Sequence, residues 1–176
     1  MTGPSLPRRL CRSSRGLVGH RGAVGLALAV GLLLLAVTVP VQSVLVVEDV
    51  TTGEQYLAEP VSDGSTVALE YTHSVEQSRV YDEYRVDGET LVNTRMEFES
   101  YGWGLPARVN VTTVNGTFVY APAEPITELR SLSVSPGRIA GHTLIIDGQR
   151  HDLVATTDAN DVAVHIERRT LGELIL

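Results

Sequence analysis

The feature that most restricts how this chain can fold is an uncharged, largely apolar run of 18 residues near its start, residues 22–39. A helix rises about 1.5 Å per residue, so this run would reach about 27 Å, close to the hydrocarbon thickness of a bilayer. Five arginines precede the run and all 21 acidic residues follow it. By the positive-inside rule, we expect residues 1–21 to form a basic cytoplasmic N-terminus and residues 22–40 a single transmembrane anchor. Residues 44–176 are then predicted to form an extracytoplasmic domain.

A cleaved signal peptide is the alternative interpretation of this N-terminal segment. The arginine-rich start fits a signal peptide, but the apolar run is longer than usual and no clean small-x-small cleavage site follows it. We therefore favour an uncleaved anchor in the cell membrane, and the question of cleavage stays open. The single cysteine, Cys11, precedes the run, so neither lipid attachment after the run nor a disulfide within the downstream domain is expected.

The charge of the predicted domain restricts its partners. After residue 47 there are nine arginines against 21 acidic residues, a formal charge of −12, and the whole chain contains no lysine. Such a domain should repel nucleic acid and favour cationic partners. The acidic, lysine-free composition also predicts a protein adapted to high salt, which would lose stability in dilute buffer.

Beyond residue 43 the pattern is typical of β-structure, with short runs of Val, Thr, Tyr and Ile broken by Gly, Pro, Asn and Asp. Asn-Gly at 115–116 and Asp-Gly at 147–148 and 87–88 predict tight hairpin turns, because their residues accept positive φ. About ten short strands suggest an all-β fold, either a β-sandwich or a partly closed barrel. The predicted strands are 44–49, 54–58, 66–73, 79–86, 91–98, 108–114, 117–120, 129–134, 142–146, 149–155 and 162–168.

Two polar blocks, residues 70–84 and 97–106, carry a family resemblance. The first contains Tyr-Thr-His-Ser-Val-Glu followed by Tyr-Asp-Glu-Tyr, and the second contains Glu-Phe-Glu-Ser followed by a Gly-x-Gly-Leu-Pro loop. Over residues 67–106 the chain resembles the domain-of-unknown-function family 1850 (DUF1850), a set of small anchored or exported proteins. The resemblance implies association with membrane subunits of tripartite, periplasmic-type (TRAP) transporters for carboxylate-like solutes. An accessory role that contacts a solute or partner is therefore expected.

Metal binding or enzymatic activity is the alternative function, and it would use His73, Glu76 and Glu83. Imidazole and carboxylate groups together suit Zn²⁺, but no second histidine lies at a recognised ligand interval. We therefore expect His73 to close the end of a strand through hydrogen bonds, and we predict no metal and no cofactor. The remaining histidines of the C-terminal part could approach His73 only through folding; they are His142, His151 and His165.

Catalysis by a serine nucleophile is not expected. Ser74 follows His73 directly, and adjacent residues of a strand point to opposite faces, so the pair cannot act as nucleophile and base. The chain also lacks a Gly-x-Ser-x-Gly motif. We therefore predict that the protein is not an enzyme.

Arginines and aromatic residues complete the candidate binding residues. Arg79 and Arg95 alternate with carboxylates on neighbouring predicted strands, which favours cross-strand ion pairs over a clamp for a carboxylate ligand. Tyr101 and Trp103 flank glycines in a loop, where core packing is favoured over the lining of a pocket.

Two N-glycosylation triplets begin at Asn110 and Asn115, in or beside a predicted hairpin. We treat both as candidate modification sites on the translocated side, dependent on the host.

Overall fold

The computed structural model describes residues 25, 31, 40–101, 105, 109–170 and 172–173. The chain divides into two compact units, Met1–Thr38 and Val39–Leu176. In the first unit only Gly25 and Gly31 are described, and both are helical. The predicted anchor over residues 22–40 therefore lies almost entirely outside the described residues. Within the described residues, no helix is long and apolar enough to cross a membrane.

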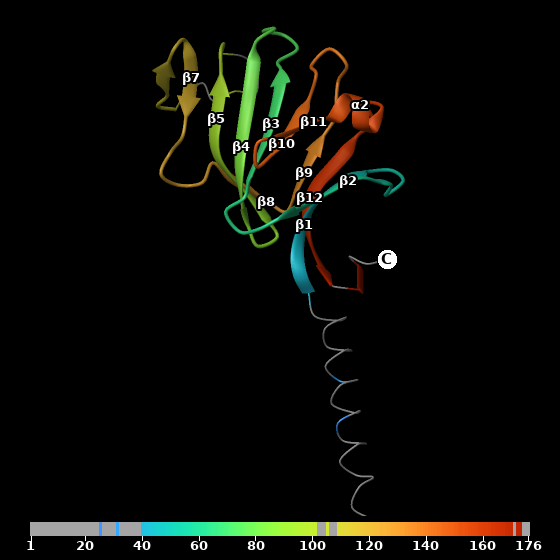
Figure 1. Cartoon of the computed structure of the whole chain (residues 1–176). Helices are drawn as coiled ribbons and strands as arrows, with labels where there is room; N and C mark the ends of the chain where they lie inside the picture. The colour runs from blue at the N-terminus through green and yellow to red at the C-terminus, as the bar shows by residue number, and fades with distance from the viewer. Residues whose placement is uncertain are drawn as a thin grey trace, which may run out of the picture. The chain divides into compact units, whose positions relative to one another are not determined.

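The second unit is all-β, as predicted, and its strands form two antiparallel sheets (Figure 1). The four-stranded sheet has the order β2-β1-β12-β9 and the eight-stranded sheet has the order β11-β10-β3-β4-β5-β7-β6. In addition, β8 pairs with the opposite end of β5 from β7. The first sheet contains β1 (Pro40–Asp49), β2 (Gln55–Val61), β9 (Ser131–Val134) and β12 (Val162–Thr170). The second contains β3 (Thr66–Thr72), β4 (Arg79–Asp87), β5 (Thr90–Phe98), β6 (Thr112–Val114), β7 (Thr117–Tyr120), β8 (Thr127–Leu129), β10 (Thr143–Ile146) and β11 (Gln149–Asp152).

The larger hydrophobic core cluster draws side chains from both sheets. Leu45 of β1 and Val164 of β12 belong to it together with Val67 of β3 and Leu144 of β10, and all four side chains are completely buried. Buried residues alternate with more exposed ones along β4, β10 and β12, as one-sided burial requires, whereas Val44–Val47 of β1 are buried without interruption. A core shared by two antiparallel sheets is consistent with a β-sandwich.

A smaller core cluster lies where β4 begins and β5 ends. It contains Val80, Phe98 and Leu105, with the partly buried Phe118 and Tyr71 packed against it. This cluster fixes the position of Leu105, which is the described residue of the predicted Gly-x-Gly-Leu-Pro loop. The eight-stranded sheet therefore has a second, smaller apolar cluster beside the residues that follow β3.

Two of the three predicted hairpin turns are confirmed, and the third is shifted by one residue. Residues 115–116 and 147–148 have positive φ at both positions, and the flanking residues pair directly. Between β4 and β5, however, Asp87 still pairs with Thr90, so the two-residue loop is Gly88 and Glu89. Only Gly88 of that loop has a positive φ, because Asp87 is held in the extended ladder.

Several predicted strand boundaries were wrong. The predicted strand 149–155 ends at Asp152, whose side chain accepts a hydrogen bond from the backbone N–H of Ala155 and caps a short helix, α2 (Leu153–Thr157). The predicted strand 129–134 is two strands, because β8 pairs in one sheet and β9 in the other, with Arg130 between them. The strand predicted at 108–114 begins at Thr112, with residues 106–108 outside the described part, and β1 begins at Pro40, four residues before the predicted start.

Candidate functional site

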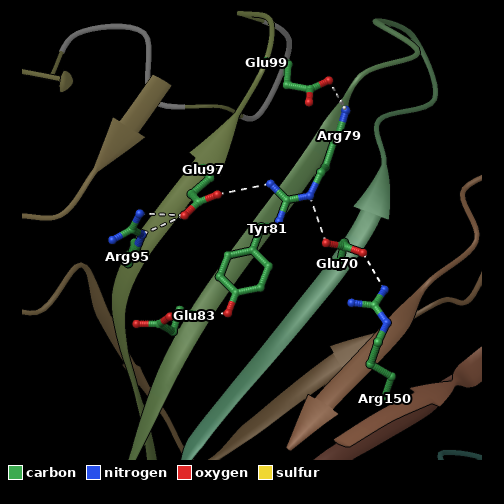
Figure 2. Close-up of polar contacts among 8 residues, drawn as sticks. All are labelled: Glu70, Arg79, Tyr81, Glu83, Arg95, Glu97, Glu99 and Arg150. Carbon is green, nitrogen blue, oxygen red and sulfur yellow. Dashed lines mark hydrogen bonds and ion pairs between the residues drawn. The ribbon is translucent and has the colours of Figure 1, made fainter. Parts of the chain in front are cut away.

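One face of the eight-stranded sheet carries a row of alternating charges, which we call the charge ladder (Figure 2). Nε of Arg79 donates to Glu70 at 2.8 Å, and a terminal guanidinium nitrogen donates to Glu97 at 3.1 Å. Glu70 also accepts from Arg150 at 2.6 Å, and Glu97 accepts from Arg95 at 2.7 Å. The register places these side chains on one face of neighbouring strands, which is why they meet. Arg79 therefore holds two carboxylates at once, from β3 and from β5.

The charge ladder keeps its carboxylates ionised. Burial alone would raise the pKa of Glu70, but hydrogen bonds from Arg150 and Arg79 and their charges outweigh it and lower the pKa. The pKa of Glu97 is lowered in the same way by Arg79 and Arg95 against partial burial. Because both pKa values are lower in the folded state, the ionised Glu70 and Glu97 stabilise the fold above the ordinary glutamate pKa. This contribution to the free energy of unfolding is lost as the pH falls through the lowered values.

Replacing Arg79 with methionine should lower the free energy of unfolding by about 1–2 kcal/mol, because two partly exposed ion pairs are lost and each is worth up to about 1 kcal/mol. Arg95→Met removes the contact with Glu97 alone and should cost about 0.5 kcal/mol. Urea unfolding at pH 7 measures both values. Equal losses for the two variants would contradict the central position of Arg79.

His73 and Ser74 lie at a cleft of about 310 Å³ at the end of β3. Its described lining consists of residues 71–74, Leu105, Ala140 and His142, and we call this site the cleft. The backbone N–H of Thr72 donates to the carbonyl of Ala140 at 2.8 Å, which ties the strand to the loop before β10. The rings of Tyr71 and His142 stack with their centroids 5.1 Å apart.

The three residues of the predicted metal site are not gathered in one place. Glu76 follows His73 in the loop after β3, and its carboxylate accepts from the hydroxyl of Ser100 at 3.2 Å. Glu83 pairs across from Ala68, four residues along β3 from Thr72, which is about 13 Å of strand. There Glu83 accepts a hydrogen bond from the hydroxyl of Tyr81 at 3.3 Å. Among the residues that the structure describes, no group of three His, Cys, Asp or Glu side chains could hold a metal ion.

Tyr101 packs in an aromatic group and is not among the described residues that line the cleft. Its ring contacts Phe98 edge-on at 5.3 Å and Phe118 at 4.5 Å, although 46% of the residue remains exposed. Trp103, the other predicted aromatic residue of this loop, lies outside the described residues. The two candidate glycosylation residues, Asn110 and Asn115, are both exposed, and Asn115 forms the hairpin turn.

A buried polar group that the sequence reasoning missed lies on the inner face of β4. Asp82 is 8% exposed, and its Oδ1 has no hydrogen-bond partner. Burial raises the pKa of Asp82 to about 6. Tyr84 lies two residues further along the same face, and its hydroxyl is hydrogen-bonded to Asn93 of β5. Burial, followed by the nearby charge of Asp82, raises the pKa of Tyr71 to about 12.

The sequence reasoning also missed the partners that β10 and β11 bring to β3. Antiparallel pairing of β10 with β3 places His142 beside Tyr71, and the next strand brings Arg150 to Glu70. His142 and Arg150 are about 70 to 80 residues away in the chain from Tyr71 and Glu70, and no local sequence pattern predicts such a pairing. The sequence predicted only that His142 could approach His73 through folding.

The fold and the site define an all-β domain with two antiparallel sheets, a charge ladder on one face and a small cleft at the end of β3. Residues 67–153 match the family model described as "Domain of unknown function (DUF1850)". The chain belongs to this family, which confirms the resemblance expected from residues 67–106 and extends it to Leu153, the first residue of α2. No curated protein and no solved structure matches the chain.

Proposed function

We propose that this chain is a membrane-anchored, extracytoplasmic accessory domain of a TRAP-type transporter, which binds a solute or a transporter subunit and does not catalyse a reaction. The observation that carries the proposal is the position of the cleft. Every described residue that lines it lies within the segment that matches the family. The cleft therefore lies within the part of the chain that matches the family model, and not in the segments outside that match.

The charge distribution supports the proposed topology. Arginines precede the apolar run of residues 22–39, and the domain that follows carries all 21 acidic residues. This asymmetry favours a cytoplasmic N-terminus and a translocated domain. An acidic domain outside the membrane would be kept away from anionic headgroups and would be free to meet a partner.

Purification of the full chain from native membranes, with an affinity tag after Leu176, tests the proposal. We expect large membrane subunits of a transporter to accompany the chain, and the N-terminus to be intact. His142→Ala in the cleft should weaken this association, whereas the control Glu124→Gln on an exposed loop should not. A reporter fused after Leu176 that proved cytosolic, or a chain recovered with no transporter subunit, would contradict the proposal.

A further inference from the structure

The cleft is built from two segments that are distant in the chain and held rigidly together. The hydrogen bond from Thr72 to Ala140 joins their backbones, and the stacked rings of Tyr71 and His142, inclined by 11°, form one wall. Leu105, which is 8% exposed and belongs to the smaller core cluster, adds an apolar surface. A cavity of this size and mixed lining is suited to a small ligand held by a few polar groups.

A backbone hydrogen bond fixes which nitrogen of the neutral His142 imidazole carries the proton. The N–H of Gly137 donates to Nδ1 of His142 at 3.2 Å, and the N–H of Glu76 donates to Nδ1 of His73 at 3.3 Å. A neutral imidazole has one donor and one acceptor nitrogen, so an accepting Nδ1 places the hydrogen on Nε2. Burial lowers the pKa of His142, which favours this neutral form. His142, which lines the cleft, is therefore a hydrogen-bond donor through Nε2, and not a metal ligand through that atom.

The other polar groups of the cleft are also able to donate. Thr72 and Ser74 line the cleft and carry hydroxyl groups, and the phenol of Tyr71 keeps its proton because its pKa is raised to about 12. The described lining includes no Arg, Lys, Asp or Glu. The charge of Asp82 acts on Tyr71 and would repel an anion. An oxygen acceptor without a full negative charge suits these surroundings best.

We infer that the cleft binds a small, uncharged molecule through a carbonyl or amide oxygen, which accepts a hydrogen bond from Nε2–H of His142. This inference rests on the proposed function in one respect, namely that the domain contacts a small ligand. It assigns that ligand to a different chemical class from the carboxylate-like solutes that the family resemblance implies. The stacked Tyr71 ring holds the imidazole in position, and Thr72 and Ser74 line the same cleft.

The tautomer is tested first, on the full chain in a mild detergent with its histidines labelled with ¹⁵N. Long-range ¹H–¹⁵N correlation spectra distinguish the two neutral tautomers. We expect the His142 ring to carry its proton on Nε2 at pH 7.5. A proton on Nδ1 would overturn the inference, because Nε2 would then be an acceptor.

Ligand class is tested in the same detergent on uniformly ¹⁵N-labelled chain, by titration with N-methylacetamide and, separately, with sodium acetate, using sodium chloride to equalise ionic strength. The His142 signals should shift with the amide and remain in place with acetate. His142→Phe, which keeps a ring for stacking and lacks the N–H, should abolish the shifts of neighbouring Ser74. A response to acetate as large as that to the amide, or shifts of Ser74 that persist in the variant, would overturn the inference. If a transporter subunit co-purifies but the amide causes no shift, only this inference is wrong. If the amide causes the shift but no subunit co-purifies, only the proposed accessory role is wrong.

Discussion

Replacing Asp82 with asparagine should raise the free energy of unfolding at pH 7 by about 2–3 kcal/mol. Asp82 lies between Val80 of the smaller core cluster and Tyr84 of the larger one, so a carboxylate separates two apolar regions. Its Oδ1 is buried without a hydrogen-bond partner, and burial alone raises its pKa from 3.8 to about 6. At pH 7 the folded protein must therefore hold an ionised group in surroundings that disfavour the charge. Asparagine has nearly the same shape and no charge.

The pH dependence of stability follows from the direction of this shift. Because the folded state binds the proton of Asp82 more tightly than the unfolded state, the protein gains stability from this group as the pH falls from about 6 towards 4. His142 acts in the opposite direction, since its lowered pKa makes stability fall as the pH drops below its usual value of 6.5. The difference between Asp82→Asn and the unmodified protein cancels the contribution of His142 and isolates Asp82.

Urea unfolding at pH 7 and at pH 5 measures this difference. The stabilisation by Asp82→Asn should be largest at pH 7 and should shrink at pH 5, where the aspartate of the unmodified protein is already protonated. Glu124→Gln is the matched control, because it makes the same change of charge at an exposed position and should alter stability little. A variant that is less stable than the unmodified protein at pH 7 would show that Asp82 has a partner or a favourable environment as an anion.

The parts of the fold that depend on neighbouring residues could be predicted from the sequence. Short runs of Val, Thr, Tyr and other strand-forming residues between turn residues identified β3, β4 and β5 nearly to their ends. The Asn-Gly and Asp-Gly turns at 115–116 and 147–148 were predictable because their positive φ values are a local property. The alternation of buried and exposed positions along β4 could have identified Asp82, since it shares its face with Val80, Tyr84 and Val86.

The parts that depend on distant pairing could not be predicted. The expected ion pair between Arg79 and a carboxylate of a neighbouring strand joins β4 to Glu97 of β5 within one hairpin, so it depends on nearby residues. The contact between Arg150 and Glu70 exists because β10 pairs with β3 across more than 70 residues. The short helix α2 was also hidden, because the capping by Asp152 depends on where the strand before it leaves the sheet. Hydrophobic pattern specifies which face of a strand is buried, and it leaves strand order open.

Replacing Phe98 with alanine should lower the free energy of unfolding by about 3–4 kcal/mol, the largest loss that we expect from one substitution in this part of the domain. Phe98 is completely buried at the end of β5, with Val80 and Leu105 in the same core cluster. Its ring also packs against Phe118 at 5.6 Å, across the pairing of β5 with β7. Alanine would leave a cavity that three separate segments border, and a paired sheet can close such a cavity only in part.

Tyr101→Ala is the matched control for this substitution, because Tyr101 belongs to the same aromatic group and is 46% exposed. Its loss should cost about 1 kcal/mol, since less apolar area leaves water on folding. Urea unfolding at pH 7 measures both variants. Because Leu105 both packs in this cluster and lines the cleft, Phe98→Ala should also weaken the shift of the His142 signals by N-methylacetamide. Equal and small losses for the two variants would mean that the smaller core cluster is not closely packed, and that the cleft has no rigid support on the side of Leu105.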